Sequence, residues 1–164
     1  MRAKEATTHL IGFTGGMLQM FIGDFSEADM TVRPAPGANC AAWQIGHLIA
    51  SEVEILKAEV PAYKPVELPP GFIAAHDTDA AKADPPRAFF GRQQYIDLFK
   101  KVRAATLALT GELPDEALDQ PTSANWRPLT PKIGNLLNFM AVHDLMHFGQ
   151  LTVIRRKLGK PVLM

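Results

Sequence analysis

The chain has 164 residues, the length of one ordinary domain, and it can bury a hydrophobic core without disulfides. Hydrophobic residues make up 47% and charged residues 21%, a balance typical of soluble globular proteins, which indicates a single domain over residues 1–164. The 17 basic and 17 acidic residues cancel, and no basic stripe of the kind that binds nucleic acid is present.

Residues 3–25 form the first predicted helix, because apolar residues recur on one face of it. Glycines interrupt this face, and we interpret Gly12 and Gly16 as places where another helix approaches closely. Met17 and Met20 are expected to fill gaps in the core, as are Met140 and Met146 later in the chain.

The second predicted helix covers residues 40–60, with Asn39 as its N-terminal cap. A proline-rich segment, 61–86, follows and is irregular; segments of this length are often functional or mobile. The third helix is expected to begin at Pro85 after an Asp84 cap and to end at Gly111.

The last predicted helix covers residues 132–158, capped by Thr130, and follows a second connector, 112–131, that contains a short helical turn from Asp115. The basic run Arg155-Arg156-Lys157 fits a solvated helix C-terminus, where the helix dipole favours cations. No strand-like alternation is present. The fold class is therefore all-α, a four-helix bundle with long crossover connections.

Cys40 is the only cysteine, so an intramolecular disulfide cannot form and nothing indicates an oxidising compartment. The N-terminal stretch lacks the pattern of a signal peptide. No apolar run reaches the roughly 18 residues of a membrane helix. We therefore expect a cytoplasmic protein that does not bind membranes.

His143 and His147 are four residues apart in the last helix, which places both imidazoles on one face, one turn apart. Two such rings can bind one transition metal at about 2.0–2.1 Å each. The pair lies in an apolar stretch, where unpaired polar groups are costly to bury and a metal would satisfy both. His47, within the second helix, is the natural third ligand; the alternative is a core histidine bonded to a carbonyl.

These residues carry a resemblance to a family. Trp43-x-x-Gly46-His47-Leu48, then His143-x-x-x-His147-x-Gly149-Gln150 and Arg155-Arg156-x-Leu158-Gly159, resemble the DinB-like (YfiT-like) metal-dependent four-helix bundles. The resemblance extends over nearly the whole chain in helix order.

The resemblance implies that His47, His143 and His147 bind a divalent metal such as nickel, zinc or iron, and that the protein is a homodimer. Relatives include thiol-dependent transferases and isomerases, so a low-molecular-weight thiol is an expected co-substrate. Three nitrogen ligands leave coordination positions open, which fits catalysis better than a closed structural site. The leading hypothesis is a metal-dependent enzyme of thiol-transferase or hydrolase type that acts on a small molecule. The alternatives are a non-enzymatic metal- or ligand-binding bundle and a metal-free structural bundle.

Other residues near these motifs have competing interpretations. The string His143-Asp144-Leu-Met-His147 resembles the HExxH motif of metalloproteases, but Asp replaces the Glu base and the strands of that fold are missing. Asp144 is expected to face solvent or to orient a ligand. Trp43 could wall the metal pocket or be plain core, and Glu54 could reach a bound water or pair at the surface. Four further interpretations complete the set: Gln150 as a contact near His147, His9 as a residue approaching from the first helix, His76 as a solvated loop histidine, and Cys40 as an inert thiol.

Overall fold

The computed structural model describes residues 2–163 and consists of helices and loops. Four long helices form the bundle: α1 (Ala3–Ile22), α2 (Ala41–Glu59), α4 (Arg92–Glu112) and α5 (Ile133–Lys157). A short helix, α3 (Phe72–Ala75), lies outside it, together with three 3-10 turns, Asp29–Thr31, Ala80–Lys82 and Asp115–Asp119. Within the described residues no strand forms, which confirms the all-α fold class. None of the described helices is both long and apolar enough to cross a membrane.

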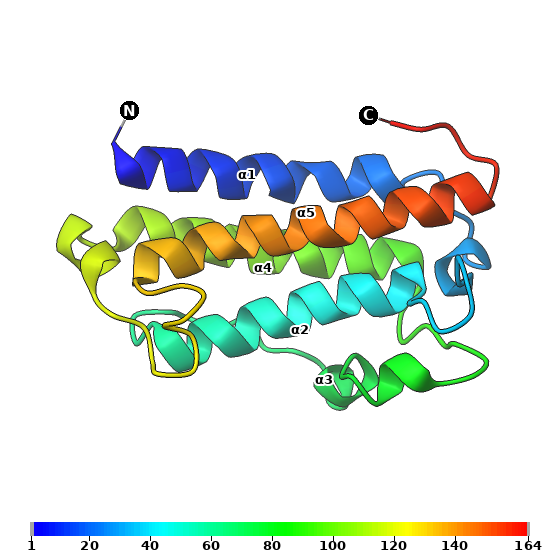
Figure 1. Cartoon of the computed structure of the whole chain (residues 1–164), viewed down its shortest axis with the longest axis horizontal. Helices are drawn as coiled ribbons and strands as arrows, with labels where there is room; N and C mark the ends of the chain where they lie inside the picture. Colours follow the sequence, from blue (N-terminus) through cyan, green and yellow to red (C-terminus); the bar gives the residue numbers. More distant parts are fainter. Residues whose placement is uncertain (1, 164) are drawn as a thin grey trace.

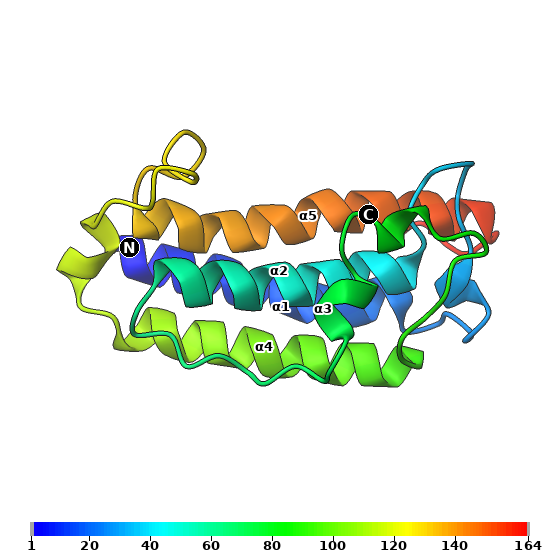
Figure 2. The ribbon, with the colours of Figure 1, turned by 90° about the horizontal axis from the view of Figure 1, so that it is seen from below.

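The four long helices pack in a square, in which α1 and α2 each contact both α4 and α5. Helices α1 and α5 run in one direction and α2 and α4 in the other (Figure 1). Because α2 and α4 are parallel, residues 60–91 must return along the bundle before α4 can begin. Figure 2 shows this crossover, which includes α3, passing over α2 and α4. The second long connector, 113–132, joins helix ends at the same end of the bundle and does not cross.

The helix bounds agree with the sequence pattern to within two residues except at two ends: α1 ends at Ile22 and not at Phe25, and α4 begins at Arg92 and not at Pro85. Residues 83–91 form an irregular segment with bends. Phe89 and Phe90 pack on Phe72, and the Phe89 N–H donates to the Tyr95 hydroxyl at 3.0 Å. The predicted caps were also wrong. The residues that directly precede α2, α4 and α5 are Cys40, Gly91 and Lys132, so Asn39, Asp84 and Thr130 do not cap these helices. Gly111 does not end α4, which continues to Glu112.

The core fills the centre of the square along its whole length and includes Met17 and Met140. Met20 and Met146 are exposed, contrary to the core role expected for them. Arg155 is not a solvated helix end: it is 2% exposed, and its guanidinium donates to the Phe21 carbonyl at 2.8 Å and to the Asp24 carboxylate at 3.0 Å. The helix terminus is therefore fastened to α1 by a buried cation.

Candidate metal centre

Three histidines converge where α2 packs against α5. His47 comes from α2, and His143 and His147 come from successive turns of α5. Their ring centroids are 4.9 to 5.3 Å apart, and one ring nitrogen from each lies within 4.8 Å of the others. This spacing is close to what three ligands of one ion need, since each metal–nitrogen bond is about 2.0–2.1 Å. Among residues 2–163 no other group of histidine, cysteine or carboxylate side chains converges in this way.

Neighbouring side chains orient the three rings. Trp43, one turn before His47, stacks on it with centroids 4.7 Å apart and planes 10° from parallel. Phe139 stacks on His143 at 5.6 Å with an angle of 12°. The interpretation of Trp43 as a wall of the site is therefore the one that the geometry favours.

His147 is held by a hydrogen bond from α2. Its Nδ1 lies 3.2 Å from the Gln44 Oε1, and the Gln44 amide nitrogen donates to the Asn39 carbonyl, which fixes the orientation of the amide. An amide oxygen only accepts, so Nδ1 of His147 carries the proton and its Nε2 presents a lone pair. This arrangement of a ligand histidine and an acceptor is the one that metal sites commonly use.

The site favours neutral imidazoles. Burial lowers the pKa of His143 to about 4 and that of His147 to about 3, and the proximity of the rings to one another adds to both effects. Burial also lowers the pKa of His47. Neutral imidazole is the form that binds metal, and three such nitrogens suit zinc, nickel or iron without selecting one of them. The donor set therefore fits a divalent metal ion.

A pocket of about 300 Å³ opens beside His47, between α2 and the crossover. Ser51 and Glu54 line its α2 side, and Ile73 and Thr78 line its crossover side. The Ser51 hydroxyl is 3.5 Å from both ring nitrogens of His47. Glu54 is exposed and lines this pocket together with His47. Gln150 and His9 are exposed and do not line this pocket.

His76 is not a solvated loop residue, as the sequence analysis expected. It is 2% exposed, and its Nδ1 is 2.7 Å from the Phe72 carbonyl. A carbonyl only accepts, so Nδ1 is protonated and Nε2 accepts the Tyr95 hydroxyl at 2.9 Å. His76 fastens the crossover against α2, beside His47. Its only sequence signal is indirect: Gly46, directly before His47, is the small residue against which the His76 ring packs.

Asp144 does not face solvent either. Its carboxylate accepts from Arg103 of α4, at 2.7 Å, and the same guanidinium lies 2.8 Å from Glu52 of α2. Burial raises the pKa of Glu52 and raises that of Asp144 to about 7, although Arg103 opposes both shifts. Sequence analysis missed Arg103 and Glu52. Each lies four residues after a buried apolar residue of its own helix, Phe99 and Leu48, so a charge on the apolar face was the available signal.

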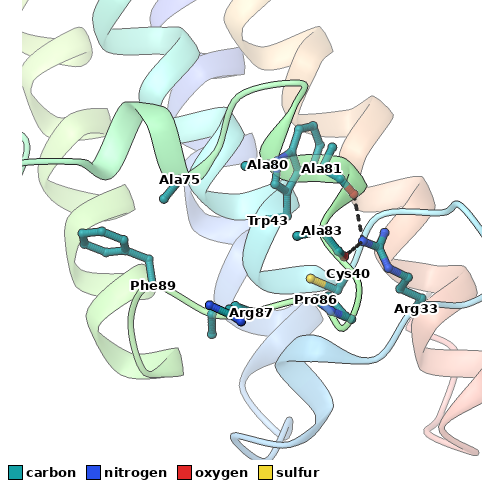
Figure 3. Close-up of a pocket in the computed structure, with 11 residues that line it drawn as sticks. Arg33, Cys40, Trp43, Ala75, Ala80, Ala81, Ala83, Pro86, Arg87 and Phe89 are labelled. Carbon is teal, nitrogen blue, oxygen red and sulfur yellow. Dashed lines mark hydrogen bonds between the residues drawn. The ribbon is translucent and has the colours of Figure 1, made fainter.

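A second hollow, of about 310 Å³, is lined by Trp43 but by none of the three histidines (Figure 3). Its wall is largely alanine and proline methyl and methylene groups from residues 75–88. Arg33 sits at its edge, with its guanidinium bonded to the carbonyls of Ala81 and Ala83. The Cys40 thiol lies on its inner wall, where burial raises the thiol pKa and so disfavours the reactive thiolate.

Comparison with known proteins identifies the family. A profile of the DinB superfamily matches residues 12–151. The fold is similar to YfiT from Bacillus subtilis, described as a probable metal-dependent hydrolase with an unusual four-helix bundle topology: the TM-score is 0.69 at 16% identity, over 96% of this chain and 89% of that one. It is also similar to a conserved protein from Enterococcus faecalis, with a TM-score of 0.76 at 18% identity, over 98% and 99% of the two chains. A search of curated proteins finds no match. Because the matched region is most of the chain, the protein belongs to the DinB superfamily.

Proposed function

We propose that this protein is a metal-dependent hydrolase whose single divalent ion is held by His47, His143 and His147. The observation that carries the proposal is the convergence of three imidazoles, one buried and two half-buried, each with a ring nitrogen within 4.8 Å of the others. A shared metal ion would give these three nitrogens one common partner. YfiT, which has the same fold, is described as a probable metal-dependent hydrolase, and this supports the assignment.

The chain supplies three nitrogens, which is the number that catalytic sites typically provide, because further coordination positions stay free for water and substrate. The bound ion would act as a Lewis acid and lower the pKa of a bound water. The residues of the chain supply the rest. Gln44 and Trp43 orient the rings, and the apolar packing around His143 and His147 keeps them unprotonated.

The pocket beside His47 is the proposed substrate site. Its volume, about 300 Å³, suits a small molecule. The Glu54 carboxylate lines the pocket on α2, and we assign it the role of accepting a proton from the attacking nucleophile. A low-molecular-weight thiol could bind the ion in place of water and act as the nucleophile. The activity assays must therefore include thiol transfer as well as hydrolysis.

The proposal is tested by elemental analysis of untagged protein beside the variant His47→Ala/His143→Ala/His147→Ala. About one ion per chain, lost in the variant, is the expected result. Panels of esters, amides and activated thiol acceptors are then assayed with Zn²⁺, Ni²⁺ and Fe²⁺, with and without a thiol. Absence of metal from the wild-type protein after reconstitution would refute the proposal. Metal binding without turnover of any substrate would favour a non-enzymatic metal-binding bundle.

We also propose that the protein forms a homodimer through the outer faces of α1 and α5, which pack side by side (Figure 1). Large apolar side chains are exposed at helical spacing on both helices. Gly16 and Gly149 lie among them, with open space above each. A monomer rarely leaves so many apolar side chains in water, and symmetric dimers are the commonest assemblies. The exposed apolar residues of the two helices are Phe13, Met20, Val142, Leu145, Met146 and Val153.

A further inference from the structure

We propose that Arg103 is a positioning residue for the metal centre: it sets the register of the two ligand-bearing helices and so the spacing of the three histidines. This inference rests on the proposed metal binding. Arg103 belongs to α4, which contributes no histidine to the site. Its role would be exerted through the carboxylates that it joins, one on each ligand-bearing helix.

The Arg103 guanidinium is shared between two helices. Its Nη2 lies 2.8 Å from Glu52 of α2 and 2.7 Å from Asp144 of α5, and it also reaches the second Asp144 oxygen at 2.9 Å. The Thr106 hydroxyl, one turn after Arg103, donates to Glu52 as well. The single cation of Arg103 therefore joins α2 to α5 inside the bundle, away from solvent.

Both carboxylates lie close in sequence to proposed ligands. Asp144 directly follows His143, and Glu52 is five residues after His47 on the same continuous helix. Because a helix is stiff along its axis, a movement of one turn displaces the next turn by nearly the same distance. A slip of α2 along α5 would therefore move His47 relative to His143 by the same amount. Metal sites tolerate only about 0.2 Å in ligand distance, so a small slip is enough to weaken binding.

The cost of the cluster indicates a role other than stability. The side chains of Arg103, Glu52 and Asp144 are only 4%, 4% and 1% exposed. Two further guanidinium nitrogens of Arg103, Nε and Nη1, are buried without a partner among the described residues. Buried ion clusters are often no more stable than apolar packing of the same volume, and in some proteins they serve to select one arrangement of the packed elements.

Helix α1 is shaped around this side chain. A Cβ at Gly15 would come within 2.5 Å of Arg103 Cγ, so glycine there leaves the space that the arginine fills. Thr14, the residue before it, is fully buried and close enough to Asp144 for its hydroxyl to lower the pKa of that carboxyl. All four long helices thus contribute to the cluster beneath the histidines.

The chain contains a matched control, Arg155. It is also buried and also pairs with a carboxylate, Asp24, but it fastens the far end of α5 to α1, and its hydrogen bonds and ion pair among residues 2–163 do not involve α2. Lysine in place of either arginine keeps the charge, but its side chain ends one atom short of the Nη nitrogens that make these contacts. Both substitutions should lower the melting temperature of the metal-free protein, but only the one at Arg103 should change the metal centre.

The test measures Co²⁺ binding to Arg103→Lys, Arg155→Lys and the wild-type chain, by the visible absorption spectrum of the ion and by competition with a chelator. For Arg103→Lys we expect an altered spectrum and an affinity about 10–100-fold weaker, in line with other substitutions behind metal ligands. Arg155→Lys should match the wild type. Unchanged binding in Arg103→Lys, or equal losses in both variants, would overturn the proposal. Absence of Co²⁺ binding by the wild type would instead refute the metal centre itself, and this inference with it.

A second variant separates position from stability. Glu52→Leu/Arg103→Met/Asp144→Leu replaces the cluster with apolar side chains and is expected to fold at least as well as Arg103→Lys. If the cluster sets the register, Co²⁺ binding stays weak although the melting temperature recovers. Recovery of wild-type affinity together with stability would show that any packing suffices and would overturn the proposal. So would loss of the folded state in both variants, since the cluster would then serve folding itself.

Discussion

The imidazole of His76 lies against the backbone of Gly46, so closely that a Cβ atom on Gly46 would come within 1.9 Å of His76 Cδ2. This contact joins the crossover to the turn of α2 that presents His47. The ring cannot simply move aside, because both of its nitrogens are hydrogen-bonded and it is almost fully buried.

Gly46→Ala should therefore displace His76 and loosen the crossover. We expect a loss of about 1–3 kcal/mol in the free energy of unfolding, the usual cost of overpacking. Urea denaturation measures this, and hydrogen exchange should show faster exchange over residues 71–91. Gly111→Ala is the control: nothing lies within 4 Å of its added methyl, and alanine is the better helix former. Equal stability of the two variants would contradict the contact.

The Tyr95 hydroxyl continues this series of contacts, since it donates to His76 and accepts from the Phe89 N–H. Tyr95→Phe removes a hydrogen-bond partner from the buried His76 ring and from the partly buried Phe89 N–H, and should cost about 1–3 kcal/mol. Tyr63→Phe is its counterpart, because the buried Tyr63 hydroxyl has no hydrogen-bond partner among the described residues. We expect that variant to be as stable as the wild type, or more so. Thermal denaturation of the two variants side by side decides the point.

Gln44 should control metal affinity through His147, whose Nδ1–H it accepts. Gln44→Leu removes the acceptor, and we expect metal to bind about 10–100-fold more weakly. Gln44→Glu keeps an acceptor in the same place and should retain most of the affinity. Competition with a chromophoric chelator measures both. If the leucine variant binds metal as the wild type does, the orienting role of Gln44 is wrong.

Acid should destabilise the metal-free protein through its histidines. His143 and His147 have folded pKa values of about 4 and 3, whereas an unfolded histidine titrates near 6.5. Between those values the unfolded chain binds more protons, so the free energy of unfolding falls as the pH falls. Asp144, whose folded pKa is about 7, acts in the opposite direction.

The comparison of wild type with His143→Gln/His147→Gln isolates the histidines, because Asp144 is present in both proteins. We expect the stability of the chelator-treated wild type to fall more steeply from pH 7 to pH 5 than that of the double variant. Urea titrations at pH 7, 6 and 5 provide the slopes. Parallel slopes would mean that the histidines are protonated in the folded protein.

The proposed dimer should depend on the exposed apolar faces of α1 and α5. Phe13→Glu/Met146→Glu places carboxylates on both faces and should yield a monomer by size-exclusion chromatography with light scattering. Leu129→Glu alters an equally exposed residue in the connector before α5 and should leave the dimer intact. A wild-type monomer at every concentration, or a double variant that remains dimeric, would rule out this interface.

The sequence by itself determined the four helices, the all-α class and the pairing of His143 with His147. All of these follow from the 3.6-residue period of a helix, which acts over one or two turns and can be read from neighbouring residues. The motif that includes Trp43, Gly46 and His47 added the third histidine through a family resemblance, and the family itself is confirmed.

Only the tertiary structure decided where the long-range partners lie. His76 has the sequence surroundings of a solvated loop residue, whereas Arg103 and Arg155 are charges on the apolar faces of their helices. Each is buried against a group from another element. Phe89 and Phe90 likewise delay the start of α4, because they pack on Phe72 across the crossover. The burial of a polar side chain depends on whether a distant segment brings a hydrogen-bond partner to it, and the pattern of neighbouring residues does not show which segment that is.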